Sequence, residues 1–277
     1  MKCGSLRNKL FIKISIMKKN IYLLLILTSM GSLLWSCSKQ ATDGIATKTS
    51  IEGSAFIKIA HFSPAFRLAV NGSDSFNVYV NGMKLNGAFL TYGSLFPSVT
   101  NMYAAVPAGN NIIRLTMNGV LTPDSLMIAT YTKSLVAGKY YSFIITDSLK
   151  STSNSKQIFV EDNFMFSDTT TFTMRFVNAI MNDTAGKNVD VYSTRRASNI
   201  FYNVSPGTVS EFVPQPYNFV TDTLIVRRAG SMFELARLST ASNPLGRNRA
   251  YTLVYKGLPG VLTTGTKGRS LVTFANQ

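Results

Sequence analysis

The sequence predicts an all-β protein built from two tandem immunoglobulin-like antiparallel β-sandwiches. From residue 54 onward, short runs of β-branched and aromatic residues are separated about every 8–12 residues by Gly, Pro, Asn or Asp, as in sandwich strands and turns. No window shows a sustained apolar stripe at helical spacing between caps. The 277-residue chain is 45% hydrophobic, which is enough for two cores at about 100–150 residues per domain.

Residues 1–36 are predicted to be a signal peptide. Two lysines precede an apolar run at 21–34, which is shorter than the roughly 20 residues of a transmembrane helix. The string Leu34-Trp35-Ser36-Cys37 resembles the lipobox of bacterial lipoproteins. That resemblance implies cleavage before Cys37 and a diacylglyceryl thioether on its sulfur, with fatty acids such as palmitate holding the protein to a membrane. An uncleaved signal anchor is the alternative, and Met17 is the candidate true start.

Residues 37–53 are predicted to form the lipidated cysteine and a flexible polar tether. Without the six basic residues of 1–36, the remaining 22 basic residues face 13 acidic ones, a net charge of +9. Most of the excess lies in residues 171–277, with 12 basic and 5 acidic residues. This half could contact acidic glycans or anionic lipid headgroups, and a merely solvated basic surface is the alternative. Export argues against nucleic acid as a partner.

The strands are expected in a regular order. Residues 76–80 alternate between apolar and polar positions, and Asn81-Gly82 follows, a dipeptide typical of a type I′ hairpin turn. The other predicted strands are 111–117, 139–146, 171–178, 188–193, 209–213, 223–228 and 249–256.

The two halves of this strand pattern look like copies of each other. Three segments correspond in order: 57–61 with 174–178, 77–79 with 190–192, and 139–143 with 249–253. We therefore expect a first sandwich at residues 54–165 and a second, degenerate copy at residues 166–277.

Four strings of the first half form a recognisable set. They are His61-Phe62-Ser63-Pro64, Asn77-Val78-Tyr79-Val80-Asn81-Gly82, Val106-Pro107-Ala108-Gly109 and Leu135-Val136-Ala137-Gly138-Lys139-Tyr140-Tyr141. This set resembles the bacterial family called domain of unknown function 4397, although Asn178 replaces the His in the second half. The resemblance implies exported β-sandwich modules, often tandem and often lipidated, in Bacteroidetes-like bacteria. It carries over no catalytic residues.

Enzymatic function is not expected. His61 is the single histidine, and no G-x-S-x-G elbow is present to place a nucleophile. Both cysteines precede the predicted sandwiches, so zinc would lack nitrogen and sulfur ligands, and no calcium-loop pattern occurs. We expect no catalytic residues, no metal and no cofactor. A hydrolase would need His61, whose expected role is structural.

Binding residues are the remaining candidates. Tyr79 and Tyr192 occupy equivalent positions on the face opposite the apolar side chains of their strands, and we expect both to be exposed. Cross-strand packing under a neighbouring side chain is the alternative. The most compact basic features are two separated pairs, Arg195-Arg196 and Arg227-Arg228.

A further pattern predicts exposed turns. Asp followed by Ser or Thr and then by an aliphatic residue or Thr occurs at Asp124, Asp147, Asp168, Asp183 and Asp222. Each resembles the O-glycosylation acceptor of Bacteroidetes, and Asx-turns at strand ends are the alternative.

These observations favour a cell-envelope lipoprotein, anchored in the outer membrane through Cys37, whose sandwiches act as non-enzymatic binding or structural modules. The alternative is a surface adhesin-like protein that binds acidic glycans through the basic second domain. A glycan or an envelope protein is the expected partner besides the membrane. The face of the membrane stays open, because Ser38-Lys39-Gln40 lacks the acidic cluster associated with surface export.

Overall fold

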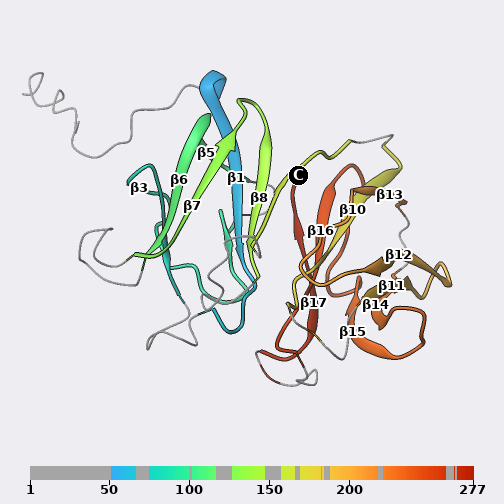
Figure 1. Ribbon diagram of the computed structural model, residues 1–277. Coiled ribbons are helices and arrows are strands. Elements are labelled where there is room, and N and C mark those ends of the chain that lie inside the picture. Colours follow the sequence, from blue (N-terminus) through green and yellow to red (C-terminus); the bar gives the residue numbers. More distant parts are fainter. Residues whose placement is uncertain are drawn as a thin grey trace, which may run out of the picture. The chain divides into compact units, whose positions relative to one another are not determined.

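The computed structural model has β-strands and one short 3-10 turn as the regular secondary structure of its described residues (Figure 1). It describes residues 51–66, 75–99, 102–116, 127–146, 157–165, 169–181, 183, 188–217, 221–259, 265 and 267–277. The predicted signal peptide, Cys37 and most of the predicted tether lie outside these ranges. Within them, no helix has the length and hydropathy that a bilayer-spanning segment needs.

Strands β1 to β9 form two sheets, preceded by the 3-10 turn η1 (Ile51–Gly53). One sheet has the order β4 (Leu95–Phe96), β1 (Ser54–His61), β8 (Tyr140–Ile145) and β9 (Ile158–Glu161), with β5 (Ala104–Pro107) also pairing with β1. The other has the order β3 (Met83–Lys84), β2 (Asn77–Val80), β6 (Gly109–Thr116) and β7 (Met127–Leu135).

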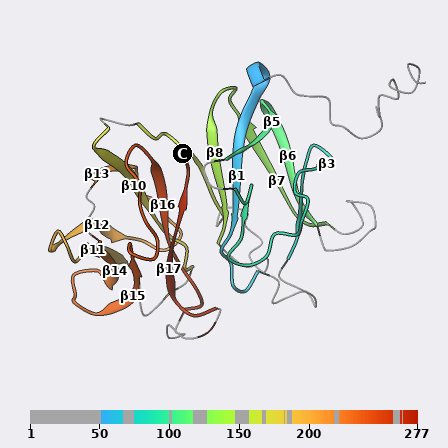
Figure 2. The ribbon, with the colours of Figure 1, turned by 180° about the vertical axis from the view of Figure 1, so that it is seen from behind.

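Strands β10 to β17 form a second pair of sheets. One has the order β13 (Val213–Pro216), β10 (Thr171–Asn178), β16 (Ala250–Lys256) and β17 (Ser270–Ala275). The other has the order β12 (Ser198–Val204), β11 (Val189–Ser193), β14 (Thr223–Arg228) and β15 (Glu234–Ser239). Strands β10, β16 and β17 lie side by side in the front and back views (Figures 1 and 2).

The pairing pattern is the same in both halves. Strand β1 runs parallel to β8, and β10 runs parallel to β16, while the other ladders are antiparallel. The all-β sandwich prediction is confirmed, with these two parallel pairs as a departure from a purely antiparallel sheet. A parallel pair needs a long connection, and here most of each sandwich lies between its two parallel strands.

Each sandwich has its own apolar core. In the first, alternate residues of β2 and β6 face β1 and β8, with Val78, Leu115, Ile57 and Phe143 fully buried. The second core has the same arrangement around Val191, Val226, Phe176 and Leu253. Alternation of this kind is what a sheet with one buried face requires.

A third apolar cluster joins the two sandwiches, which together form one compact unit at Thr49–Gln277. Its buried members from the first sandwich are Ala60, Phe62, Ile144 and Ile158, and those from the second are Val177, Ala179, Val254 and Phe274. Strands β1, β10 and β16 are therefore covered on both faces, which explains why each has apolar residues at both odd and even positions.

One strand prediction is wrong in position. The segment 209–213 was expected to be a strand, but before Val213 it holds only an isolated bridge from Val209 to Val177. The ladder begins at Val213, where β13 pairs with β10. Both prolines of β13 are tolerated because it is an edge strand, where a missing N–H can face away from the ladder.

Candidate functional site

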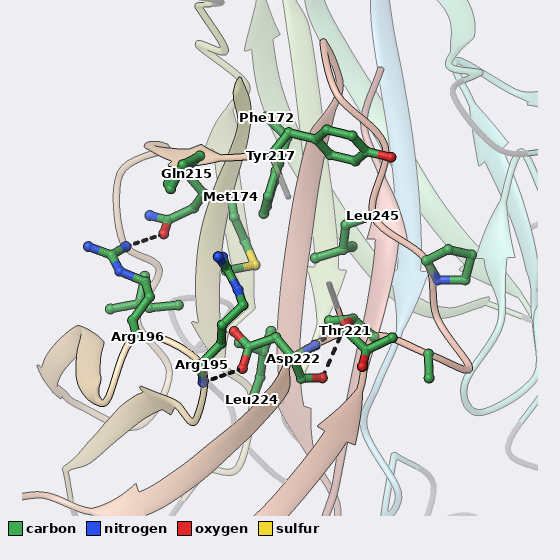
Figure 3. Close-up of a pocket in the computed structure, with 15 residues that line it drawn as sticks. Phe172, Met174, Arg195, Arg196, Gln215, Tyr217, Thr221, Asp222, Leu224 and Leu245 are labelled. Carbon is green, nitrogen blue, oxygen red and sulfur yellow. Dashed lines mark hydrogen bonds between the residues drawn. The ribbon is translucent and has the colours of Figure 1, made fainter. Parts of the chain in front are cut away.

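The second sandwich contains a pocket of about 230 Å³. Strands β10 and β13, the turn after β11, and the segment after β15 supply its walls (Figure 3). Its apolar lining includes Phe172, Met174, Ile200, Tyr217, Leu224 and Leu245, and its polar lining includes Arg195, Arg196, Gln215 and Asp222. The structure thus places one of the two predicted basic pairs in a pocket.

The turn that carries these two arginines is held by Asp222. One carboxylate oxygen of Asp222 accepts hydrogen bonds from the backbone N–H of Arg195 at 2.9 Å and from the Thr194 hydroxyl at 3.1 Å. The other oxygen accepts from the Ser193 hydroxyl. Because both oxygens already have partners, Asp222 acts as an anchor for the turn and not as an open acceptor for a ligand.

Gln215 is the polar residue buried deepest in the pocket lining, at 3% exposure. Its carbonyl oxygen accepts a hydrogen bond of 2.5 Å from Arg196 Nη1 (Figure 3). That bond orients the amide, since a guanidinium can only donate. The Gln215 amide nitrogen and Arg195 Nε are then buried without a hydrogen-bond partner, so two donors at this pocket are unsatisfied.

The first sandwich differs at the corresponding place. Its hairpin turn has two residues, Asn81 and Gly82, where the second sandwich has four, from Thr194 to Ala197. The counterpart of Asp222 by register is Asn111, whose side chain donates to the Pro107 and Gly109 carbonyl oxygens. The longer turn is what brings an arginine pair to the second sandwich.

The other predicted pair, Arg227 and Arg228, lies at the opposite end of the same two strands. Ser193 pairs with Leu224, whereas Val189 pairs with Arg228, four residues or about 13 Å along the sheet. The Arg227 guanidinium lies 3.7 Å from the ring centre of Tyr192, and that of Arg228 lies 5.0 Å from Phe233. The four predicted arginines therefore do not form one basic surface.

The two candidate tyrosines occupy equivalent register positions, opposite Arg114 for Tyr79 and opposite Ile225 for Tyr192. Both are half-buried and not fully exposed. For Tyr192 the covering group is the Arg227 guanidinium, so the packing alternative describes this residue better than an open contact surface.

His61 is fully buried at the end of β1. Its ring packs against Phe66, Phe76 and Tyr92 at centroid distances of 4.8 to 6.1 Å. Burial also raises the pKa of Tyr92 to about 12. This apolar enclosure agrees with the structural role expected for His61 and leaves it closed to a substrate.

A buried ionic cluster lies between the sandwiches. Arg175 Nη2 is 2.6 Å from Asp162 Oδ1, and the two side chains are 2% and 0% exposed. The other oxygen of Asp162 accepts hydrogen bonds from Tyr103 at 2.5 Å, Ser142 at 2.7 Å and Asn276 at 3.3 Å. Oδ2 therefore carries the hydrogen bonds, whereas the charge at Oδ1 is compensated by the ion pair with Arg175 and by no hydrogen bond.

Lys58 belongs to the same cluster. It donates to the carbonyl oxygen of Ala275 at 2.6 Å and lies 4.8 Å from the ring centre of Tyr103. Burial lowers the Lys58 pKa to about 8, with Asp162 opposing and Arg175 reinforcing that shift. Burial, followed by the charge of Asp162, raises the pKa of Tyr103.

The residues of this cluster occupy equivalent positions in the two sandwiches. Lys58 pairs in register with Ser142, as Arg175 pairs with Thr252. Asp162 and Asn276 also occupy equivalent positions. The backbone N–H of Asp162 donates to the carbonyl oxygen of Tyr140, and that of Asn276 donates to the carbonyl oxygen of Ala250. Sequence analysis missed these residues, although a cation inside an apolar run, repeated in both copies, was a usable signal.

The expectation of exposed Asp turns is wrong for Asp183. This residue is 4% exposed, and its carboxylate accepts two hydrogen bonds from Arg269, at 2.8 and 3.0 Å. Asp222 is a half-buried anchor of the pocket turn. Both carboxylates are held by residues distant in the sequence, Arg269 for Asp183 and the turn after β11 for Asp222, and a three-residue motif does not encode such contacts. The strings at Asp124, Asp147 and Asp168 lie outside the described residues.

No three His, Cys, Asp or Glu side chains gather closely enough to hold a metal ion within the part of the chain that the structure describes. The predictions of lipidation at Cys37 and of its membrane partner also fall outside that part.

Comparisons with known proteins add little at this level of similarity. No family model and no curated protein sequence matches the chain, so the resemblance to domain of unknown function 4397 stays a prediction. One similar solved structure is the fimbrial anchor protein Mfa2 from Porphyromonas gingivalis, at 9% identity and a TM-score of 0.23, covering 80% of this chain and 97% of that one.

Another similar structure is from Bacteroides thetaiotaomicron and is described as a candidate polysaccharide-binding protein of domain-of-unknown-function family 1812. It has 11% identity and a TM-score of 0.20, covering 74% of this chain and 92% of that one. Scores this low support no argument about function, so the assignment below rests on the chain's own residues.

Proposed function

We propose that this chain is a non-enzymatic lipoprotein of the cell envelope whose second sandwich binds acidic glycans at the pocket beside Arg195 and Arg196. One observation carries this proposal. The pocket combines an apolar lining with arginine and amide donors, and two of these donors lack a partner. Sites for small ligands have this composition, with a few placed polar groups in an apolar recess.

The nearby titratable groups support binding over catalysis. Asp222 is occupied by the Ser193, Thr194 and Arg195 groups that it holds. His61 belongs to the first sandwich and packs inside an aromatic enclosure. A general base must reach the proton that it removes, and neither side chain is placed to do so at the pocket.

The separation of the two arginine pairs supplies a matched test of glycan binding. Full-length protein in detergent micelles would be passed over immobilised polygalacturonate, with neutral dextran as the parallel surface. We expect salt-sensitive binding to polygalacturonate alone. The double variant Arg195→Ala/Arg196→Ala should lose it, while Arg227→Ala/Arg228→Ala, which removes the same charge, should retain it. Equal loss in both variants would show that net charge, and not the pocket, is responsible.

The envelope location needs its own test, because the proposal places a lipid on Cys37. Cells grown with an alkyne-tagged palmitate should incorporate the tag into the wild-type chain and not into Cys37→Ala. Two acyl chains give durable anchoring, at about 0.8 kcal/mol per buried CH₂. Labelling of the Cys37→Ala variant at the wild-type level would overturn the lipobox interpretation.

The membrane face is tested by treating intact cells with a non-penetrating protease. Degradation of residues 54–277 would support the adhesin-like alternative and place the pocket where external glycans reach it. Protection until lysis would favour a periplasmic role in envelope assembly, with the pocket then facing glycans or proteins of the periplasm.

A further inference from the structure

We infer that the pocket of the second sandwich takes a single carboxylate-bearing sugar residue, and that the chain has one such site. This inference rests on the proposed glycan-binding function and specifies its ligand. It is carried by the two unsatisfied donors, by the chemistry of the pocket walls, and by the different turn in the first sandwich.

The donors define what the ligand must offer. The Gln215 amide nitrogen and Arg195 Nε are buried without partners, and a buried donor left without an acceptor is energetically unfavourable. A carboxylate is purely an acceptor, with about four lone-pair positions on two oxygens. Small side-chain adjustments would let it accept from both donors, and the charge-assisted bond to Arg195 would be the stronger one.

The orientation of the Gln215 amide favours an anionic ligand over a cationic one. Arg196 already donates to the amide oxygen, so only the NH₂ end of Gln215 is left to meet a ligand. The single carboxylate in the pocket lining, that of Asp222, accepts three hydrogen bonds from residues 193–195 at the turn after β11. A cationic ligand would therefore meet two arginines and an amide donor, opposed by one carboxylate that is already engaged.

The walls fit a sugar ring. Tyr217, Pro216, Pro244 and Leu245 contribute apolar surface, which suits the C–H face of a pyranose in the way that aromatic rings suit other amphipathic partners. The pocket volume of about 230 Å³ lies just below the roughly 300–1,000 Å³ of most small-molecule sites, which suits a ligand of about one sugar residue.

The first sandwich lacks the features that make this site. Its two-residue turn carries no arginine, because Asn81-Gly82 stands where the second sandwich has Thr194 to Ala197. Asn111, the counterpart of Asp222, donates to the Pro107 and Gly109 carbonyl oxygens and also accepts from Asn81. We therefore expect one ligand per chain despite the duplication.

The inference is tested by titrating full-length protein in micelles with monosaccharides in a calorimeter. We expect galacturonate or glucuronate to bind at one site per chain, and galactose or glucose to bind at least tenfold more weakly. Succinate, a carboxylate without a ring, should also bind at least tenfold more weakly. Equal affinity for the neutral sugars, or two sites per chain, would overturn the inference.

Two variants test the contributions of the Gln215 and Arg195 donors separately. Gln215→Glu keeps the size of the side chain and its contact with Arg196 but replaces the donor with an anion, so affinity for the acidic sugar should fall at least tenfold. Arg195→Met keeps the apolar stem and should weaken binding similarly, and it serves as the second variant if Gln215→Glu melts early. Arg227→Met is the control and should bind as the wild type does. Unchanged binding in both pocket variants would refute the proposed site.

The polymer experiment separates the two proposals. Binding of polygalacturonate without any binding of the monosaccharide acids would overturn the single-residue inference and leave the glycan-binding function in place. Failure of both polymer and monosaccharides would reject both. Stronger binding of acidic peptides than of the acidic sugars would also overturn the inference and indicate a protein partner.

Discussion

The buried ion pair between Arg175 and Asp162 makes a demanding prediction about stability. Asp162→Asn keeps the shape of the side chain but removes its charge. The Arg175 guanidinium, at 2% exposure, would then lose the anion that lies 2.6 Å from it. The burial of both side chains limits the access of solvent that could replace that anion.

The expected loss in the free energy of unfolding follows from the contacts that Asp162 makes. Removing one partner of a buried ion pair costs about 3–5 kcal/mol, since the other charge stays buried and uncompensated. The three hydrogen bonds from Tyr103, Ser142 and Asn276 weaken at the same time, because an amide oxygen is a poorer acceptor than a carboxylate. We expect a loss of about 4 kcal/mol, or a melting temperature lower by about 8–16 °C at 2–4 °C per kcal/mol for a unit of this size.

Urea unfolding followed by circular dichroism would measure the change in the free energy of unfolding. Arg175→Met/Asp162→Asn, which removes both charges, should recover part of the loss, since replacing a whole buried pair is often close to neutral. A loss below about 1 kcal/mol in the single variant would refute the view that this pair is buried and holds the sandwiches together.

Two further predictions concern the same compact unit. The lowered pKa of Lys58, about 8 in the folded chain against 10.5 unfolded, means that the unfolded state binds more protons above pH 8. Lys58 should therefore contribute about 2 kcal/mol more to stability at pH 10 than at pH 8, at 1.36 kcal/mol per unit, and the difference in stability between wild type and Lys58→Met in urea titrations should change by that amount over this range. Gly257→Ala should destabilise by about 2 kcal/mol or more, because φ is +135° and a Cβ would lie 2.5 Å from the Gly268 carbonyl oxygen. Gly87→Ala, with nothing within 4 Å, is the control, and equal melting temperatures for the two variants would contradict the argument.

Much of the fold could be predicted because strand periodicity is local. The alternation at 76–80 and the Asn81-Gly82 turn correspond to β2 and its hairpin, with φ of 50° and 84° at the two turn residues. The aligned segments of the two halves became strands with the same pairing partners. Strands such as β12 and β15 were not anticipated, because edge strands have fewer buried positions and a weaker periodic signal.

The candidate site could be predicted only in part. Arg195 and Arg196 were singled out by charge, but the same criterion selected Arg227 and Arg228, which cover Tyr192 and Phe233 instead. Gln215 carried no sequence signal beyond its place between two prolines. Its importance comes from Arg196, a residue 19 positions away that orients its amide.

The sequence by itself determined the all-β class, the repeated strand pattern and the enrichment of positive charge in the second half, because composition and short-period patterns are properties of neighbouring residues. Only the tertiary structure decided which charges are buried and which donors are left without partners. Those outcomes depend on register and on contacts between distant strands, as when Asp162 meets Arg175 across the two sandwiches. The same dependence separates an arginine that lines a pocket from one that packs over an aromatic ring.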